Sequence, residues 1–147
     1  MDASTRLPFD NQVAVLTLTG AELKRAIKQN LQGDSAVMSY SGIRVVATCD
    51  RGQLQVVLER SSKRQVNDGD VLKVVTNEFL ATGGDDFLKA VMPLRIAPSM
   101  DGTLVRDRIA DWLTRNGGSW RAADLFDPAN RRLIYPGERP VRCDAGS

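Results

Sequence analysis

Histidine is absent from all 147 residues of this sequence, and that absence excludes several classes of enzyme. Ser-His-Asp catalysis needs an imidazole to take the proton of the nucleophile, and catalytic metal sites normally need histidine or clustered carboxylates. The one close carboxylate pair outside predicted turns is Asp85-Asp86. We therefore predict no catalytic residue, no metal ligand and no resident cofactor in this chain.

Aromatic residues are scarce at 5%, and the net charge is only +2, from 20 basic and 18 acidic residues. Proteins that bind single strands rely on rows of aromatic side chains in a basic groove, and neither is present here. Two short basic clusters, Arg60–Arg64 and Arg131-Arg132, flank predicted turns and are interpreted as solvated loop charges. The composition thus argues against a nucleic-acid partner.

Long hydrophobic runs are also missing: no segment approaches the ~20 apolar residues that cross a bilayer. The polar start, Met1–Thr5, is not a signal peptide. A strand-like sequence follows almost directly, which suggests a piece cut from a longer protein. Cys49 and Cys143 are the only cysteines; they form no metal motif, and they could be a disulfide or two free thiols.

The elements that the pattern does predict are those of one α+β domain, a mixed sheet packed with helices. Alternating apolar residues predict strands at 13–19, 43–49 and 54–58, the last two forming a hairpin. The run Val71–Val75 is continuously apolar and predicts a strand buried on both faces. Thr19 and Glu22 form a capping box that begins a helix whose Leu23, Ala26, Ile27 and Leu31 share one face.

A second amphipathic helix is predicted, capped by Asp101 or Thr103 and ended by Gly117-Gly118. Its apolar residues are predicted to face the core, and they are Val105, Ile109, Trp112 and Leu113. A short helix is expected at 122–126, and Trp120 is interpreted as a core residue or a domain contact.

The stretch Thr76–Phe87 is the most informative part of the sequence, because it puts an aromatic residue, two glycines and two carboxylates after an apolar strand. Glycines there let the backbone turn tightly and approach a ligand. Taken singly, Phe79 and Phe9 would each be interpreted as core residues, and Asp85 as a turn cap. Gly-Gly-Asp-Asp-Phe also differs by one residue from the signature of diguanylate cyclases. However, Ala81-Thr82 precede the glycines and no matching acidic strand end lies upstream, so GTP turnover is not predicted.

Four motifs in order resemble the C-terminal domain of the 5′-nucleotidase family, which includes bacterial UDP-sugar hydrolases and secreted nucleotidases. They are Leu7-Pro8-Phe9-Asp10-Asn11, Leu16–Leu23, Ser41–Arg44 and Thr76–Asp85. The resemblance covers residues 6 to about 92, and each motif alone is modest while the ordered set is specific.

The resemblance implies a division of labour between two domains. A separate N-terminal metallophosphoesterase domain, absent from this chain, holds two divalent metal ions and the catalytic histidine. The C-terminal domain binds the nucleoside part of the substrate, and a hinge rotation delivers the phosphate to the metals. By position, Phe9 and Phe79 sandwich the base and Asp85 accepts from the ribose hydroxyls, while Gly83, Gly84 and Asn77 complete the substrate-binding set.

The sequence therefore predicts that residues 1–147 form the substrate-recognition domain of a periplasmic or extracellular 5′-nucleotidase-type phosphohydrolase. It would act in nucleotide catabolism, be inert alone, and be covalently linked to the metal-bearing domain. The alternative is a stand-alone binding module of the same fold, whose site now serves a protein or glycan partner.

Overall fold

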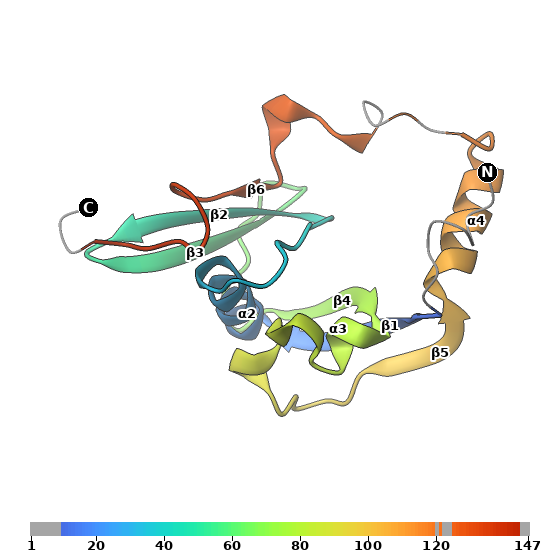
Figure 1. Ribbon diagram of the computed structural model, residues 1–147, viewed down its shortest axis with the longest axis horizontal. Helices are drawn as coiled ribbons and strands as arrows, with labels where there is room; N and C mark the ends of the chain where they lie inside the picture. The colour runs from blue at the N-terminus through green and yellow to red at the C-terminus, as the bar shows by residue number, and fades with distance from the viewer. Residues whose placement is uncertain (1–9, 120, 122–124, 145–147) are drawn as a thin grey trace.

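The computed structural model describes residues 10–119, 121 and 125–144. These residues form two three-stranded sheets with helices packed against them, which confirms the α+β class (Figure 1). Sheet A has the order β4-β1-β5, and sheet B has the order β3-β2-β6. The strands are β1 (Gln12–Thr19), β2 (Ile43–Asp50), β3 (Gln53–Arg60), β4 (Val71–Asn77), β5 (Ser99–Leu104) and β6 (Leu133–Ile134). The helices are α2 (Gly20–Gln32), α3 (Glu78–Ala81) and α4 (Val105–Arg115), with 3₁₀ turns η1 (Gly84–Asp86), η2 (Lys89–Val91) and η3 (Pro128–Asn130).

The joint between β1 and α2 is the capping box that the sequence predicts. The Thr19 hydroxyl accepts from the backbone N–H of Glu22 at 3.2 Å, and the Glu22 carboxylate accepts from the backbone N–H of Thr19 at 2.7 Å. These bonds satisfy donors that a helix start leaves open. The backbone bond from Thr19 is also the main reason that the pKa of Glu22 lies below its usual value.

Helix α2 lies between the two sheets and supplies the centre of the core (Figure 1). Its predicted apolar face is confirmed, since the buried side chains on it include Leu23, Ala26, Ile27 and Leu31. The rest of the core comes from one face of each sheet, from the segment after β4, from the loop before β4 and from the C-terminal segment. Its members are Ala14, Leu16, Leu18, Val45, Ala47, Leu54, Leu58, Val66, Leu72, Ala81, Phe87, Leu88, Val91 and Val141.

The hairpin β2–β3 is confirmed, with a continuous register from Ile43 opposite Arg60 to Asp50 opposite Gln53. Its turn residues Arg51 and Gly52 have φ values of 48° and 76°, as a tight hairpin turn requires. Strand β6 pairs with β2 in parallel. The sequence did not predict β6, because two residues carry no periodicity.

Strand β4 lies at an edge of sheet A, and within the described residues β1 is its one partner strand. Leu72 is buried, but Val71 and Val75 are 66% and 69% exposed. The prediction that Val71–Val75 is buried on both faces is therefore wrong for this chain. One face of the strand packs on the core, and no described element covers the other.

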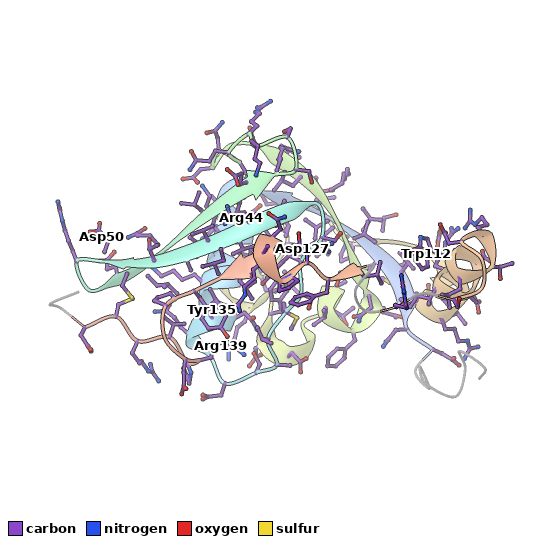
Figure 2. All side chains as sticks on the ribbon, turned by 90° about the horizontal axis from the view of Figure 1, so that it is seen from above. Arg44, Asp50, Trp112, Asp127, Tyr135 and Arg139 are labelled. Carbon is purple, nitrogen blue, oxygen red and sulfur yellow. A yellow bond between two sulfur atoms is a disulfide. The ribbon has the colours of Figure 1, made fainter. Side chains whose placement is uncertain are left out.

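Strand β5 and helix α4 differ most from the sequence prediction. Residues 99–104 pair with β1 as a strand, so the cap of α4 is Leu104 rather than Asp101 or Thr103. No residue of α4 is buried, and Trp112 is 41% exposed, so the prediction that its apolar residues face the core is wrong. Figure 2 shows Trp112 at the opposite end of the molecule from Asp50. The helix contacts its neighbouring strand β5, and its apolar residue Ile109 is also 37% exposed.

The end of α4 agrees with the sequence, since the N–H of Gly118 donates to the carbonyl of Leu113 at 2.7 Å. Trp120 and residues 122–124 of the predicted short helix lie outside the described residues.

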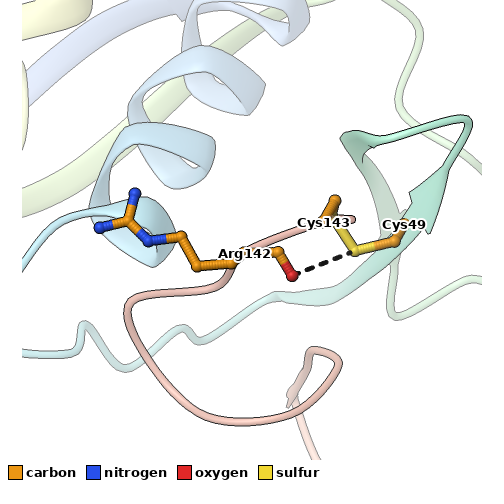
Figure 3. Close-up of a disulfide and its surroundings, with 3 residues drawn as sticks. All are labelled: Cys49, Arg142 and Cys143. Atoms are coloured by element: carbon orange, nitrogen blue, oxygen red, sulfur yellow. Dashed lines mark hydrogen bonds between the residues drawn. A yellow bond between two sulfur atoms is a disulfide. The ribbon is translucent and has the colours of Figure 1, made fainter. Parts of the chain in front are cut away.

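The C-terminal segment returns to α2 and β2 and is attached there by specific links. The Arg139 guanidinium donates to the carbonyl of Asn30 in the last turn of α2 and to those of Gly33 and Ser35 just past it. Val141 is buried at 1% exposure. Cys49 and Cys143 form a disulfide, so the alternative that the sequence left open is settled (Figure 3). The Sγ of Cys49 lies 4.0 Å from the carbonyl oxygen of Arg142, which is a contact rather than a hydrogen bond because a disulfide sulfur carries no proton.

Candidate ligand site at the end of β4

The residues that follow β4 form a short loop, Asn77–Phe87, which we call the glycine loop. Asn77 caps α3, because its side-chain oxygen accepts from the N–H of Leu80 at 2.9 Å. Ala81 is fully buried and Phe87 is 7% exposed, so both halves of the loop are anchored in the core. A loop held in this way can present side chains in fixed positions.

Phe79 is the exposed aromatic residue of this loop, with 48% of its surface accessible. A Cβ atom at Gly84 would lie 2.5 Å from Cε1 of the Phe79 ring, so the ring lies directly against the Gly84 backbone. The φ angle of Gly84 is not in the left-handed region. Glycine is therefore needed at this position to make room for the ring, rather than for backbone freedom.

The turn that follows is strained. Gly83 has φ 106°, and the next two non-glycine residues, Asp85 and Asp86, have φ 53° and 54°. Left-handed backbone at a non-glycine residue costs on the order of 1 kcal/mol, although aspartate tolerates it better than most. Gln29 on α2 supports the turn by donating to the carbonyl of Asp86 at 2.9 Å. Such strain, held by surrounding contacts, is typical of a ligand-binding turn.

The two aspartates have different surroundings. The carboxylate of Asp86 lies 3.6 Å from the Lys89 amine. The side chain of Asp85 is exposed and makes no hydrogen bond or ion pair with any residue that the structure describes. Both oxygens of the Asp85 carboxylate can therefore accept from neighbouring hydroxyl groups of a ligand.

The structure brings Phe79, Gly84 and Asp85 together, and it gives the other predicted site residues different surroundings. Gly83 provides the left-handed turn, and its nearest neighbour is the Met92 side chain. The side-chain oxygen of Asn77 is engaged by α3, which leaves only its amide nitrogen for a ligand. Phe9 lies outside the described residues, so its role stays a prediction.

The start of β1 lies at the same end of sheet A as the glycine loop. Val13 pairs with Asn77, and Asp10 pairs with Arg106 at the beginning of α4. Phe79 is half exposed and Asp85 is exposed, so both lie on the surface. The described structure therefore supplies Phe79 for one face of a flat ligand and no second aromatic ring for the other face. Sequence reasoning missed Gln29, because a polar residue on the outer face of a helix carries no signal of a supporting role.

No group of three or more histidine, cysteine, aspartate or glutamate side chains that could hold a metal ion occurs within the described residues. In the same part of the chain, no helix is long and apolar enough to cross a membrane. The arrangement at the glycine loop can stack a flat ring and accept hydrogen bonds, which is binding rather than bond-breaking chemistry.

Comparison with known proteins identifies the family and the fold. Residues 1–91 match the family model of the 5′-nucleotidase C-terminal domain. The trifunctional nucleotide phosphoesterase YfkN of Bacillus subtilis is 32% identical over 91 residues, covering 55% of this chain and 6% of that protein.

Two solved structures share the fold. The 5′-nucleotidase precursor of Thermus thermophilus superposes with a TM-score of 0.70 at 20% identity, covering 92% of this chain and 27% of the other. The NAD nucleotidase of Haemophilus influenzae superposes with a TM-score of 0.64 at 18% identity, covering 90% and 25%. The chain therefore spans about a quarter of the length of each solved relative.

Proposed function

Because the chain belongs to the 5′-nucleotidase C-terminal domain family, we propose that it recognises the nucleoside part of a nucleotide substrate. Phe79 stacks on the base and Asp85 accepts from the ribose hydroxyls. Phe9 closes the other side of the base. In the sequence Phe9 precedes Val13 by four residues, and Val13 pairs with Asn77 at the start of the glycine loop.

The observation that carries this proposal is the Phe79 ring, half exposed and seated on Gly84 next to an unpaired carboxylate. An exposed aromatic ring loses hydrophobic stabilisation, so a ring held in place on the surface favours a stacking role. Base stacking on one aromatic side chain contributes about 1–3 kcal/mol. A base held between two rings, with a carboxylate on the sugar, would be bound through groups common to all nucleosides.

For the complete protein we propose a metal-dependent phosphohydrolase of the 5′-nucleotidase type that acts in nucleotide catabolism. An N-terminal metallophosphoesterase domain, covalently linked to this one, would hold two divalent metal ions and perform the hydrolysis, and this chain would be inert alone. The small share of each relative that the chain spans supports this arrangement. The Cys49–Cys143 disulfide supports a periplasmic or extracellular location, because such bonds persist in oxidising compartments.

Nucleoside titration of the chain, followed by calorimetry, tests the recognition role. We expect Phe79→Ala to weaken nucleoside binding by about tenfold or more, as the loss of one stacking contact predicts. The matched control is Phe126→Ala, which removes another exposed phenyl ring, 61% accessible, from outside the glycine loop. The control should leave the affinity unchanged.

A second variant keeps the Phe79 ring but moves it, and so tests whether the position of the ring matters for binding. Gly84→Ala puts a methyl group where the ring of Phe79 lies, and the end of that flexible side chain can move away, so the fold should tolerate the change. We expect this variant to unfold at nearly the same denaturant concentration as the original chain and to bind nucleosides about as weakly as Phe79→Ala. Equal affinities for the original chain and all three variants would overturn the proposal and favour the stand-alone module that binds a protein or glycan.

A further inference from the structure

Two basic clusters that are far apart in the sequence meet in the folded chain. A cleft of about 210 Å³ lies where the start of β2, the turn after β3 and the segment before β6 come together. Four cationic side chains and one carboxylate line this cleft, and we call it the basic cleft; they are Arg44, Arg60, Lys63, Arg132 and Glu59. The sequence-based interpretation as solvated loop charges treated each cluster by itself, whereas the fold puts members of both into one cleft.

Backbone pairing fixes the segments that carry these cations. Arg44 and Arg60 lie on the neighbouring strands β2 and β3 of the hairpin. The N–H of Val45 donates to the carbonyl of Arg132 at 2.7 Å, which holds the C-terminal segment beside β2 (Figure 1). The turn after β3 is closed by the N–H of Lys63, which donates to the carbonyl of Arg60 at 2.9 Å. The basic cleft is therefore formed by paired strands and a hydrogen-bonded turn, and its cations have fixed starting points.

The two arginines on the strands are only loosely paired with carboxylates. Arg44 lies 3.7 Å from the carboxylate of Glu59, and Arg60 lies 3.9 Å from that of Asp70. Both distances are longer than the roughly 2.7–2.9 Å of a charge-assisted hydrogen bond. The Nε atom of Arg60 is also buried without a hydrogen-bond partner among the described residues, which is rare in native proteins. These guanidinium groups thus keep donors that a ligand can use.

The other two cations of the basic cleft have no carboxylate partner in the part of the chain that the structure describes. The side chain of Lys63 makes no hydrogen bond or ion pair there. Arg132 donates to the carbonyls of Tyr40 and Leu125 at 3.5 Å each, which is the outer limit of a hydrogen bond. By contrast Arg139, which links the C-terminal segment to α2, has a donor only 2.8 Å from a loop carbonyl. Cations left unneutralised at close quarters repel one another, and a bound anion would remove that repulsion.

We propose that the basic cleft binds a phosphate group, either as free inorganic phosphate or as a phosphomonoester. Guanidinium groups pair with phosphate oxygens through two parallel hydrogen bonds, and several cations suit a group of two negative charges. The Ser61 hydroxyl, which also lines the basic cleft and lies 3.5 Å from the carbonyl of Gly42, adds a donor that can turn toward the ligand.

The size of the basic cleft limits the rest of the ligand. Sites for drug-sized ligands have volumes of about 300–1,000 Å³, so 210 Å³ suits a phosphate with a small attached group rather than a whole nucleotide. The basic cleft also belongs to sheet B, whereas the glycine loop follows β4 of sheet A. The proposal therefore does not rest on nucleoside recognition.

Titration of the 147-residue chain with sodium phosphate at constant ionic strength, followed by NMR, tests the proposal. We expect saturable shifts of the backbone amides at 42–44, 59–63 and 130–132. Arg132→Gln should weaken the affinity by about tenfold, as the loss of one charged hydrogen-bond donor predicts. The matched control is Arg115→Gln, which removes the same charge from α4, where the side chain donates to the carbonyl of Asp111. The control should leave the affinity unchanged.

A second variant covers the case in which Arg132→Gln does not fold. Lys63→Gln changes an exposed side chain without a partner in the described structure, so the fold should remain, and the affinity should again fall. Glycerol 3-phosphate distinguishes the two sources of the group. Tighter binding than that of inorganic phosphate would assign the basic cleft to a phosphomonoester, and weaker binding would assign it to the free ion.

The proposal is overturned if phosphate causes no saturable shifts at these amides, or if chloride at the same ionic strength causes equal ones. Equal affinity for acetate would also overturn it, because the cleft would then select negative charge and not phosphate. The same holds if the folded variants at positions 63 and 132 bind phosphate as tightly as the original chain. No nucleoside enters these titrations, so this proposal and the proposed function can fail separately.

Discussion

Residues 12–91 and residues 99–144 are held in the structure by different means. Of the buried apolar residues in the described part of the chain, all except Val141 belong to the first region. The second region contains no buried residue in α4, and it is attached through the pairing of β5 with β1, the hydrogen bonds of Arg139 and the disulfide. Burial thus stabilises the first region, and a few specific links position the second.

The sequence similarity to the family is confined to the first of these two regions and the end before it. The family model matches residues 1–91, the region with the core, while the fold similarity to the Thermus protein extends over 92% of the chain. A packed core restricts side-chain volume at many positions. A region attached by a few links needs only those links, so its sequence can change while its fold remains.

The largest expected effect compares one apolar residue from each region. Ile27→Ala removes a fully buried side chain and should lower the free energy of unfolding by about 2–5 kcal/mol. Trp112→Ala removes a larger side chain from a helix without buried residues and should cost less than about 1 kcal/mol. Urea denaturation of both variants measures the difference, and equal costs would contradict the division into two regions.

The disulfide should give the next largest effect. Cys143→Ser removes a link between residues 94 apart and should lower the free energy of unfolding by about 2–4 kcal/mol. Adding a reductant to the original chain should produce the same loss, and the variant should not respond to reductant. If the variant is as stable as the oxidised chain, the second region does not depend on this link.

Two caps of the same kind permit a finer comparison. Thr19→Ala removes the cap of α2 and should cost about 1 kcal/mol, since α2 is packed in the core. Asp127→Ala removes the oxygen that accepts from Ala129 at 2.9 Å at the start of η3, a turn with no buried residue. Denaturation should show the second change to be the smaller, within about 0.5 kcal/mol, and a reversed order would be inconsistent with the comparison.

The smallest expected effect is a pH dependence. The pKa of Glu22 is lower in the folded chain than in the unfolded one, chiefly because its carboxylate accepts from the Thr19 backbone. Its contribution to stability is thus fully present above the unfolded pKa of about 4.3 and is lost as the pH falls through the lower folded pKa. Glu22→Gln should therefore be less stable than the original chain at neutral pH, and the gap should close with acid. Denaturation curves across this pH range check the trend, and a gap that does not change with pH would assign the effect to packing.

Local patterns predicted most of the first region correctly. The structure contains the predicted strand β1, the β2–β3 hairpin and the capping box at Thr19. Each of these features depends on residues that are close in sequence. Strand β5 was missed, since Ser-Met-Asp-Gly-Thr-Leu has no apolar alternation and its partner lies more than 80 residues away. The amphipathic pattern of α4 was identified correctly, but periodicity cannot show whether a surface exists to cover the apolar side.

The candidate site shows the same limits of local reasoning. Phe79 and Asp85 could be singled out from the motif, and in the structure the Phe79 ring lies against Gly84, the residue before Asp85. The reason for Gly84 could not, because it depends on the position of a ring five residues earlier. The support that Gln29 gives to Asp86 links positions 57 residues apart, and no local pattern encodes it.

The link between Cys49 and Cys143 also determines how the chain would carry mechanical tension. Residues 50–142 are closed into a covalent ring by this bond. A pull applied between a point before β1 and a point after Cys143 would travel through β1, α2 and β2 and then cross the two sulfur atoms. Phe79 and Asp85 lie inside the ring, so force could lengthen the chain around the site without drawing out the glycine loop itself.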